Sequence, residues 1–430
     1  MSMPSSIRPL LSGFRSNCHS GNYDYLKSLG GLGPCTPKSQ AAFVGRRVQA
    51  RLYSSDAPKL NYVLLTGRTL ISIDGPDATD FLHNLIPAPI LPLNDSSGSC
   101  IASAFLNAKG RILHDVFIYK PTKSSGDRWL LEVDTNSAPA VFKHLKKHKL
   151  RSKFKLQQLS QEEAAVFYLW PRSSDPPKID GLVNRQDPRP RMGRRGYLLA
   201  ENATESLRHT FAEQGSNEEY HWEDYMIHRL LNGHAEGPVE ITSEHALPQE
   251  SNLDFYGGID FKKGCYLGQE LTIRTHHTGV VRKRILPVQL YTDDEPIPKD
   301  QARPLFDPLA SLPQPPHDAN IAKCGGRGRS GRSTGKWLGG YGNIGLALCR
   351  LEAMTDVSPI AEGSQYNPDT DEFEVTWQDG LSGENKSAEV KAFVPSWLRQ
   401  ALDQSAKERS EKSQARRRRD LEDEEEDDID

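Results

Sequence analysis

Between residues 61 and 170 the sequence alternates short apolar, β-rich segments with segments whose apolar residues recur at helical spacing. This alternation restricts the fold class more than any other feature of the chain. Helices are expected over 76–86, where Pro76 suits a first turn, and over 137–149, where lysines line the outer side. Asn107-Ala108-Lys109-Gly110 suits a tight turn between two strands. Strands are expected over 62–65, 69–73, 100–106, 112–119, 129–133, 154–159 and 165–170. The pattern indicates an α+β fold of antiparallel strands with helices packed on one face.

The remainder of the chain changes character near residue 280. Residues 171–195 are rich in Pro and Arg and are expected to form a loop, and a helix is expected over 218–232 with Gly233 as its C-terminal cap. Strands dominate afterwards, at 281–290, 344–351, 373–375 and 390–393. Between them, 292–336 holds seven prolines and five glycines, a composition typical of a disordered insertion without a packed core. We therefore expect an α+β body over 54–280 and a smaller β domain, interpreted as a barrel, over 281–400.

The two ends of the chain differ from its body in charge. Residues 1–53 carry seven Lys or Arg and one acid, Asp24, which gives +6. This composition is typical of a mitochondrial presequence, with cleavage expected near 53–55 and the matrix as destination; an ordinary disordered N-terminus is the alternative. Residues 401–430 contain a basic run followed by an acidic run, and such blocks are expected to be a disordered tail. In the reducing matrix the remaining cysteines should be thiols or metal ligands: Cys100, Cys265, Cys324 and Cys349.

Several function classes are excluded by composition. The chain has 54 Lys+Arg and 57 Asp+Glu, and its body carries −5 once the +6 of 1–53 and the −4 of 407–430 are set apart. A broad nucleic-acid-binding surface is therefore not expected. No run of about 18 apolar residues occurs, so membrane insertion is not expected. The absence of a C-x-x-C pair argues against a self-contained zinc or cluster site. In the glycine-rich tract 325–345, Gly335-Lys336 is followed by Trp337, which does not fit a phosphate-binding loop.

One short segment concentrates chemistry: Lys262-Lys263-Gly264-Cys265-Tyr266-Leu267-Gly268-Gln269-Glu270. The residues after the cysteine suit a short helix to about Arg274, which would place Cys265 at a helix N-terminus. Free backbone N–H groups and lysine charge there would stabilise a thiolate, and a thiolate can ligate iron or attack an electrophile. The alternative is a small residue packed at the start of a helix.

The run 263–270 resembles the signature of the YgfZ-type proteins, folate-binding relatives of the glycine-cleavage T-protein that act in iron–sulfur cluster assembly. Further motifs follow in the order that this family has them, and the resemblance covers about 60–400. They are Lys109-Gly110-Arg111 with Asp115, Asp187-Pro188-Arg189 with Gly193 and Arg195, Gly237 and Glu240 with 248–253, and 342–348. The insertion 292–336 and the charged tail are not part of the family pattern.

The resemblance implies a folate-binding body of two related α+β subdomains, closed by a C-terminal β-barrel. It implies a late-acting factor that, with A-type scaffold proteins, matures mitochondrial [4Fe–4S] proteins such as aconitase, the lipoate-forming enzyme and respiratory subunits. The cofactors would be tetrahydrofolate and a transient iron–sulfur cluster. A tetrahydrofolate-dependent aminomethyl or one-carbon transferase is the competing enzyme class, and a structural adaptor without cysteine chemistry is a third.

The resemblance also assigns roles to single residues. Cys265 would bridge a cluster or meet a partner, and Lys263 would keep it ionised. Gly264 and Gly268 would permit a close turn and helix approach, with Gln269 and Glu270 completing the binding segment. Asp115 would contact the folate pterin. Arg189 and Arg195 would either bind the folate glutamate or brace their loop.

Overall fold

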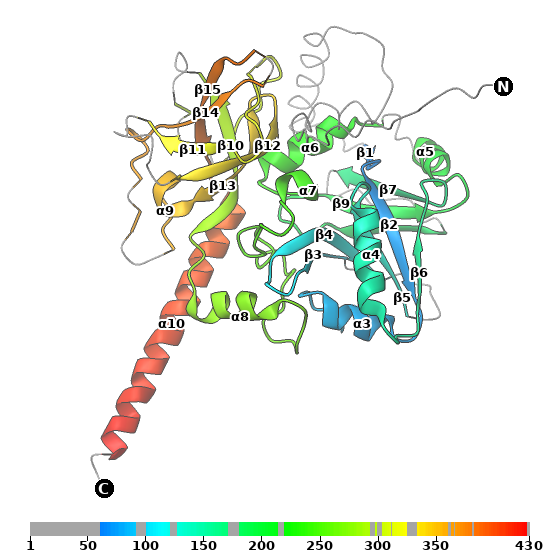
Figure 1. Cartoon of the computed structure of the whole chain (residues 1–430), viewed down its shortest axis with the longest axis horizontal. Coiled ribbons are helices and arrows are strands. Elements are labelled where there is room, and N and C mark those ends of the chain that lie inside the picture. The colour runs from blue at the N-terminus through cyan, green and yellow to red at the C-terminus, as the bar shows by residue number, and fades with distance from the viewer. Residues whose placement is uncertain are drawn as a thin grey trace, which may run out of the picture.

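The chain folds into two antiparallel sheets with their helices, a closed barrel and one long terminal helix, as the computed structural model shows (Figure 1). The residues described are 61–427 except 92–99, 121–126, 171–179, 214–218, 293–296, 299–302, 311, 325–332, 360–362, 365 and 381. The presequence expected over 1–53 and its cleavage position lie outside them. The α+β class with a C-terminal barrel is confirmed.

The first sheet has five strands in the order β3-β4-β5-β2-β6. Its strands are β2 (Arg68–Asp74), β3 (Cys100–Leu106), β4 (Ile112–Tyr119), β5 (Arg128–Asp134) and β6 (Lys155–Gln158). The apolar sides of α3 (Ala78–Leu85) and α4 (Ala138–Lys149) pack on one face of this sheet, where Leu82, Val141 and Trp129 are fully buried. The β3–β4 hairpin has the bounds that the sequence predicts.

The second sheet has four strands in the order β1-β7-β9-β8. They are β1 (Asn61–Leu64), β7 (Ala164–Trp170), β8 (Leu182–Gln186) and β9 (Arg194–Leu199), with α5 (Ala203–Glu213) and α6 (Trp222–Leu231) alongside. The strand expected over 165–170 is predicted to extend the sheet of the strands before it; that placement is wrong, because β7 pairs with β1 and β9. The loop expected over 171–195 is also wrong at β8, a strand of low apolar content that is defined by its pairing with β9. Helix α5 was not expected.

The third unit is a closed six-stranded barrel in the order β10-β13-β12-β11-β14-β15. Its strands are β10 (Lys283–Tyr291), β11 (Asn320–Lys323), β12 (Gly335–Tyr341), β13 (Ile344–Arg350), β14 (Phe373–Gln378) and β15 (Asn385–Ala392). The expectation that 292–336 lacks a packed core is wrong for the described part. Strand β11 closes the barrel by pairing with β12 and β14, and Ile321 is fully buried inside it.

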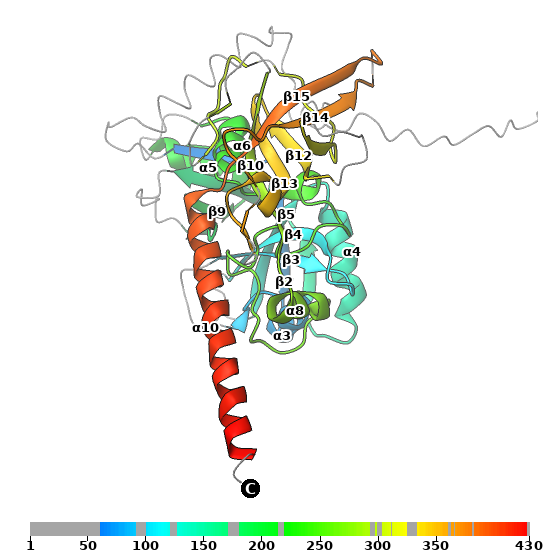
Figure 2. The ribbon, with the colours of Figure 1, turned by 90° about the vertical axis from the view of Figure 1, so that its left-hand side faces the viewer.

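Helix α10 (Ser396–Asp427) begins at the barrel and runs away from the body as a single rod (Figures 1 and 2). Its first turns are anchored by Trp397, Leu398 and Leu402, which are buried. The expected disorder over 401–430 is therefore wrong up to Asp427. Neither Gly nor Pro interrupts this stretch, and most of its residues are good helix formers. Among the described helices, none combines the length and apolar character needed to cross a bilayer.

Candidate functional site

Cys265 lies on an exposed loop and not at a helix N-terminus, which corrects the sequence-based placement. Helix α8 (Gln269–Thr278) begins four residues later, because Gly268 precedes it in the left-handed conformation with φ 80°. The Cys265 side chain is exposed and its thiol is free. A free thiol is thus presented to solvent on the segment that the sequence singled out.

Lys263 anchors this loop to the backbone at the end of α3. Its ammonium donates to the carbonyl oxygens of His83 at 2.6 Å, Ile86 at 2.7 Å and Ala88 at 3.0 Å, at the carboxyl end of α3. Burial lowers the pKa of Lys263 to about 8, against a smaller raising effect of Asp260. The expected role of keeping Cys265 ionised is not what these contacts support: the ammonium is committed to three carbonyl groups and anchors the loop.

Two glycines place the loop against the β3–β4 hairpin. A Cβ on Gly268 would overlap the carbonyl oxygen of Asn107, and a Cβ on Gly110 would lie 2.8 Å from the carbonyl oxygen of Gly268. Both residues have positive φ, near 80° and 75°. Two motifs more than 150 positions apart therefore meet backbone to backbone. Gly264 differs: a Cβ there would meet nothing within 4 Å, so the expected need for a glycine is wrong at that position.

The start of α8 fixes the other side of the loop. The Gln269 side chain accepts a hydrogen bond from the Tyr266 backbone N–H at 3.1 Å, whereas Glu270 is exposed. The Tyr266 ring is buried in the apolar cluster that continues into the barrel. Cys265 is therefore the exposed point of a segment that is held by α3 and the β3–β4 hairpin and whose Tyr266 belongs to the apolar cluster shared with the barrel.

A second constellation lies buried between the two sheets and α6. Arg195 is fully buried and donates to Glu132 from Nε at 2.9 Å, to Glu236 from Nη2 at 2.9 Å, and to the Tyr225 hydroxyl from Nη1 at 2.7 Å. Arg189 donates to Asp187 at 2.7 Å and to Glu236 at 2.9 Å. With Arg68, these residues form what we call the buried ion network.

The network sets the ionisation of its members. Burial alone would raise the pKa of Glu132 and Glu236, but the neighbouring arginines, Arg195 and Arg68 among them, together outweigh burial, so both pKa values are lowered, that of Glu236 strongly. The guanidinium groups keep their charge at any ordinary pH, because burial, which lowers their pKa, is outweighed by the adjacent carboxylates. The network is thus a charged, mutually neutralising cluster.

These contacts bear on the residues that the resemblance links to folate. Every nitrogen of the Arg195 guanidinium is engaged by a protein acceptor, and so is every one of Arg189, which matches the bracing alternative. Asp115 accepts from Arg68 at 2.8 Å and from the Gly237 N–H at 3.2 Å. A carboxylate has about four acceptor positions, so Asp115 alone retains capacity toward a ligand. Its contact with folate stays a prediction.

Sequence reasoning missed several network members: Arg68, Glu132 and Glu236. One signal was available, because Glu132 is a lone acid within the apolar run of β5 and is completely buried. A buried carboxylate requires a cation or several donors, and its partner had to lie elsewhere in the chain. Which cation it meets depends on the packing of the two sheets, which periodicity does not reveal.

Comparison with known proteins agrees with this architecture. A profile described as "CAF17, C-terminal beta-barrel domain" matches residues 282–400. The chain is similar to the glycine cleavage system aminomethyltransferase T of Bartonella henselae, with a TM-score of 0.54, 14% identity and coverage of 81% of this chain and 88% of that one. At that identity the likeness shows the fold alone.

Curated relatives are much more similar. One is the "Iron-sulfur cluster assembly factor IBA57 homolog, mitochondrial" of Aspergillus oryzae, 45% identical over 375 residues, which are 80% of this chain and 82% of the relative. The protein of the same name from Coccidioides immitis is 40% identical over 418 residues, covering 92% and 93%. At this identity and coverage, the chain belongs to the family of mitochondrial iron–sulfur cluster assembly factors of the IBA57 type.

Proposed function

We propose that this protein acts late in iron–sulfur cluster assembly in the mitochondrial matrix, where it works with A-type scaffold proteins to mature [4Fe–4S] clients. The clients would include aconitase, the lipoate-forming enzyme and respiratory complex subunits. The observation that carries the proposal is the Cys265 loop: its thiol is exposed and free, while its neighbours Lys263 and Gly268 are held against α3 and the β3–β4 hairpin.

The geometry supports delivery of a cluster as cargo. A Cys265 thiolate can ligate one iron atom of a cluster that a partner presents, and thiolates are the ordinary protein ligands of such clusters. Lys263 and Gly268 fix the position of the loop, so little ordering of the chain is needed when a partner docks. Exposure of the sulfur lets two proteins share the cluster during transfer.

Tetrahydrofolate binding is a second part of the proposal. Asp115 would hold the ligand by accepting from its pterin N–H groups, and Arg68, hydrogen-bonded to Asp115, would orient that carboxylate. Arg189 and Arg195 would support the site without touching the ligand. Tetrahydrofolate, when bound, supplies ring nitrogens able to carry one-carbon units.

Replacement of Cys265 by serine tests the cluster role. In a deletion strain, Cys265→Ser should reach normal abundance yet give low aconitase activity and low lipoylation, while [2Fe–2S] proteins stay unaffected, because a hydroxyl is a poor iron ligand. Cys349→Ser is the control: that thiol is buried in β13, so any defect should appear as lowered stability. Full rescue by Cys265→Ser would overturn the proposal.

The folate part and the transferase alternative are tested on the purified protein. Calorimetric titration with tetrahydrofolate should show binding that Asp115→Asn weakens and Cys265→Ser leaves unchanged. A one-carbon transferase, in contrast, would turn over tetrahydrofolate with or without Cys265. Turnover that persists in Cys265→Ser would favour the enzyme class.

A further inference from the structure

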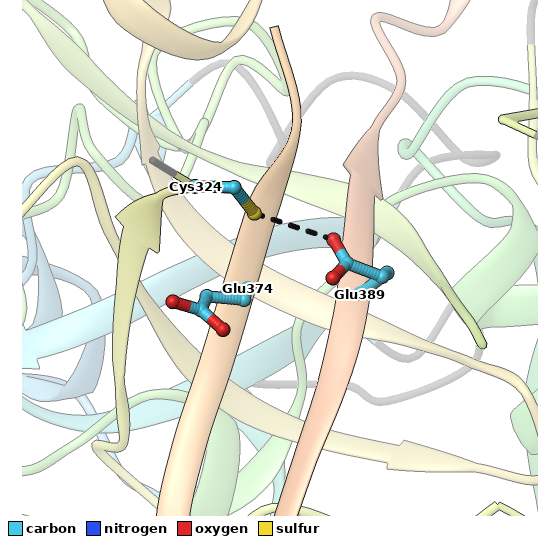
Figure 3. A group of neighbouring side chains, drawn as sticks. All are labelled: Cys324, Glu374 and Glu389. Atoms are coloured by element: carbon cyan, nitrogen blue, oxygen red, sulfur yellow. Dashed lines mark hydrogen bonds between the residues drawn. The ribbon is translucent and has the colours of Figure 1, made fainter. Parts of the chain in front are cut away.

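A thiol and two carboxylates converge on the outside of the barrel, away from the Cys265 loop. Cys324 follows β11, Glu374 lies on β14 and Glu389 on β15 (Figure 3). One ligand atom from each lies within 4.8 Å of the others, and the Cys324 thiol faces a Glu389 oxygen at 3.5 Å. All three side chains are half-buried, so an ion could reach them from solvent.

The strand register forces the two carboxylates together. Glu374 and Glu389 are direct partners across the β14–β15 ladder, so their side chains leave the sheet on the same face. Their neighbours Val375 and Val390 point into the barrel and are buried, which places both glutamates on the outer face. Like charges directly opposite each other destabilise a ladder. Within the described part of the chain, the Glu374 carboxylate has no hydrogen-bond or ion-pair partner.

An independent observation comes from Tyr291 at the end of β10. Its side chain is only 4% exposed, and it is the ladder partner of Glu389 on the side opposite Glu374. Its hydroxyl has no hydrogen-bond partner among the residues that the structure describes. Because directly paired residues of a ladder leave the sheet on the same face, the Tyr291 side chain lies on the same face as Glu389 and Glu374. Tyr291 therefore places a nearly buried side chain with an uncommitted hydroxyl beside the two carboxylates.

We propose that Cys324, Glu374 and Glu389 form a binding site for a divalent transition-metal ion of the zinc type. One sulfur and two oxygen ligands suit such an ion, and three protein ligands leave one position open for water. The ion would neutralise the opposed carboxylates. The Tyr291 hydroxyl, beside Glu389, would donate to a ligand oxygen or to the water and orient it.

Proton balance is part of the site. A cysteine thiol must lose its proton before its sulfur can bind a metal ion. Binding forms a metal–sulfur bond, breaks the S–H bond and releases that proton to solvent; no oxidant or reductant is needed.

The test is a titration of the full-length protein with Co²⁺ under reducing, anaerobic conditions, followed by competition with Zn²⁺. One equivalent should give a thiolate-to-cobalt charge-transfer band that Zn²⁺ abolishes. Cys324→Ser should remove the band, and Glu374→Gln should weaken Co²⁺ affinity at least tenfold. Cys265→Ser and Glu384→Gln, which change an exposed thiol and an exposed carboxylate elsewhere, should leave both unchanged.

A stability measurement separates metal binding from packing. Without metal, Glu374→Gln should raise the melting temperature, because it removes a like-charge pair, and Zn²⁺ should raise the melting temperature of this variant less than that of the natural sequence. A cobalt band that survives Cys324→Ser, or one that Cys265→Ser removes, would overturn the proposal, as would the absence of any band. Cluster delivery by Cys265 is assayed separately, so either proposal can fail without the other.

Discussion

The Cys265 loop and the buried ion network use the same kinds of polar residue in opposite ways. In the network, each guanidinium nitrogen of Arg195 is satisfied by a protein acceptor and the group is inaccessible. In the loop, the polar groups around Cys265 are anchored but the sulfur itself is exposed. Because the hydrogen-bonding groups of Arg195 are all engaged within the protein, we expect the buried ion network to contribute to structure. In the Cys265 loop, by contrast, the surrounding groups are anchored and the sulfur atom remains available to a partner.

The largest effect should follow from opening the network. Glu132→Ala leaves Arg195 and Arg68 buried without their shared carboxylate, so we expect a loss of about 3–5 kcal/mol in the free energy of unfolding. Urea unfolding measures it, and Glu270→Ala, at an exposed carboxylate, is the matched control. A loss below about 1 kcal/mol would mean that water reaches the network and that the two regions differ less than their contacts suggest.

An intermediate loss of folding stability is expected at the contact between the Cys265 loop and the β3–β4 hairpin. Gly268→Ala would place a Cβ against the Asn107 carbonyl in a left-handed backbone conformation, at a cost of about 1–3 kcal/mol or more. Gly264→Ala, four residues earlier, meets open space and should change stability by less than about 0.5 kcal/mol. Thermal unfolding of the two variants makes the comparison, and equal effects would contradict the glycine contact.

As the pH falls, the first loss of folding stability should come from His234, which is buried near Arg189 of the buried ion network. His234 is completely buried, donating to the Pro190 carbonyl oxygen and accepting from the Tyr256 hydroxyl, and burial together with Arg189 holds its pKa well below the usual 6.5. Between these two pKa values the unfolded chain binds a proton that the folded chain does not, so stability falls as pH drops below about 6.5.

Glu132 and Glu236 add a second decline. Their pKa values are lowered in the folded protein, so their stabilisation is present above about 4.5 and lost as pH falls through the lowered values. Urea midpoints measured from pH 7 to 3 should show both declines, and His234→Gln should reduce the first alone, without abolishing it, because burial also lowers the pKa of His144 and His228. An unchanged first decline in that variant would assign it to other histidines.

The smallest change in stability is expected for Cys265→Ser, the substitution from which we expect the largest loss of function. Cys265→Ser replaces an exposed side chain by one of similar size, so the free energy of unfolding should change by less than about 0.5 kcal/mol. Calorimetry on the purified variant measures this. A large loss would show that the thiol packs against the body and would remove the contrast drawn above.

The sequence predicted what local pattern determines. The β3–β4 hairpin follows from a turn between two apolar runs, and the body helices follow from periodicity. The strands that the sequence did not predict, β8 and β11, depend on pairing between segments that are separated in the chain. Their own strand signals are weak, and they form because β9 lies beside β8 and because β12 and β14 lie beside β11. For α10, the charge blocks predict disorder, but the same residues also favour a helix, and the helix forms.

The candidate site likewise has features that the sequence predicts and features that only the fold reveals. The signature identified the segment around Cys265, but the positive φ of Gly268 and the contacts of Lys263 are products of tertiary packing. The sequence also offered Gly110 and Gly268 as separate motif glycines, and only the fold shows that they face each other.

The manner in which α10 is attached has a mechanical consequence. At 1.5 Å per residue its 32 residues span about 48 Å. Among the α10 side chains whose burial is described, the buried ones lie in the first two turns, where Trp397 stacks on His234. Because α10 is held at one end, a small rotation there produces a large displacement at the other end. A tilt of about 10° at the packed first turns displaces the far end of the helix by about 8 Å. A spectroscopic label near Asp427, read against one on the barrel, would therefore amplify angular changes at the His234 contact into distances that are easily measured.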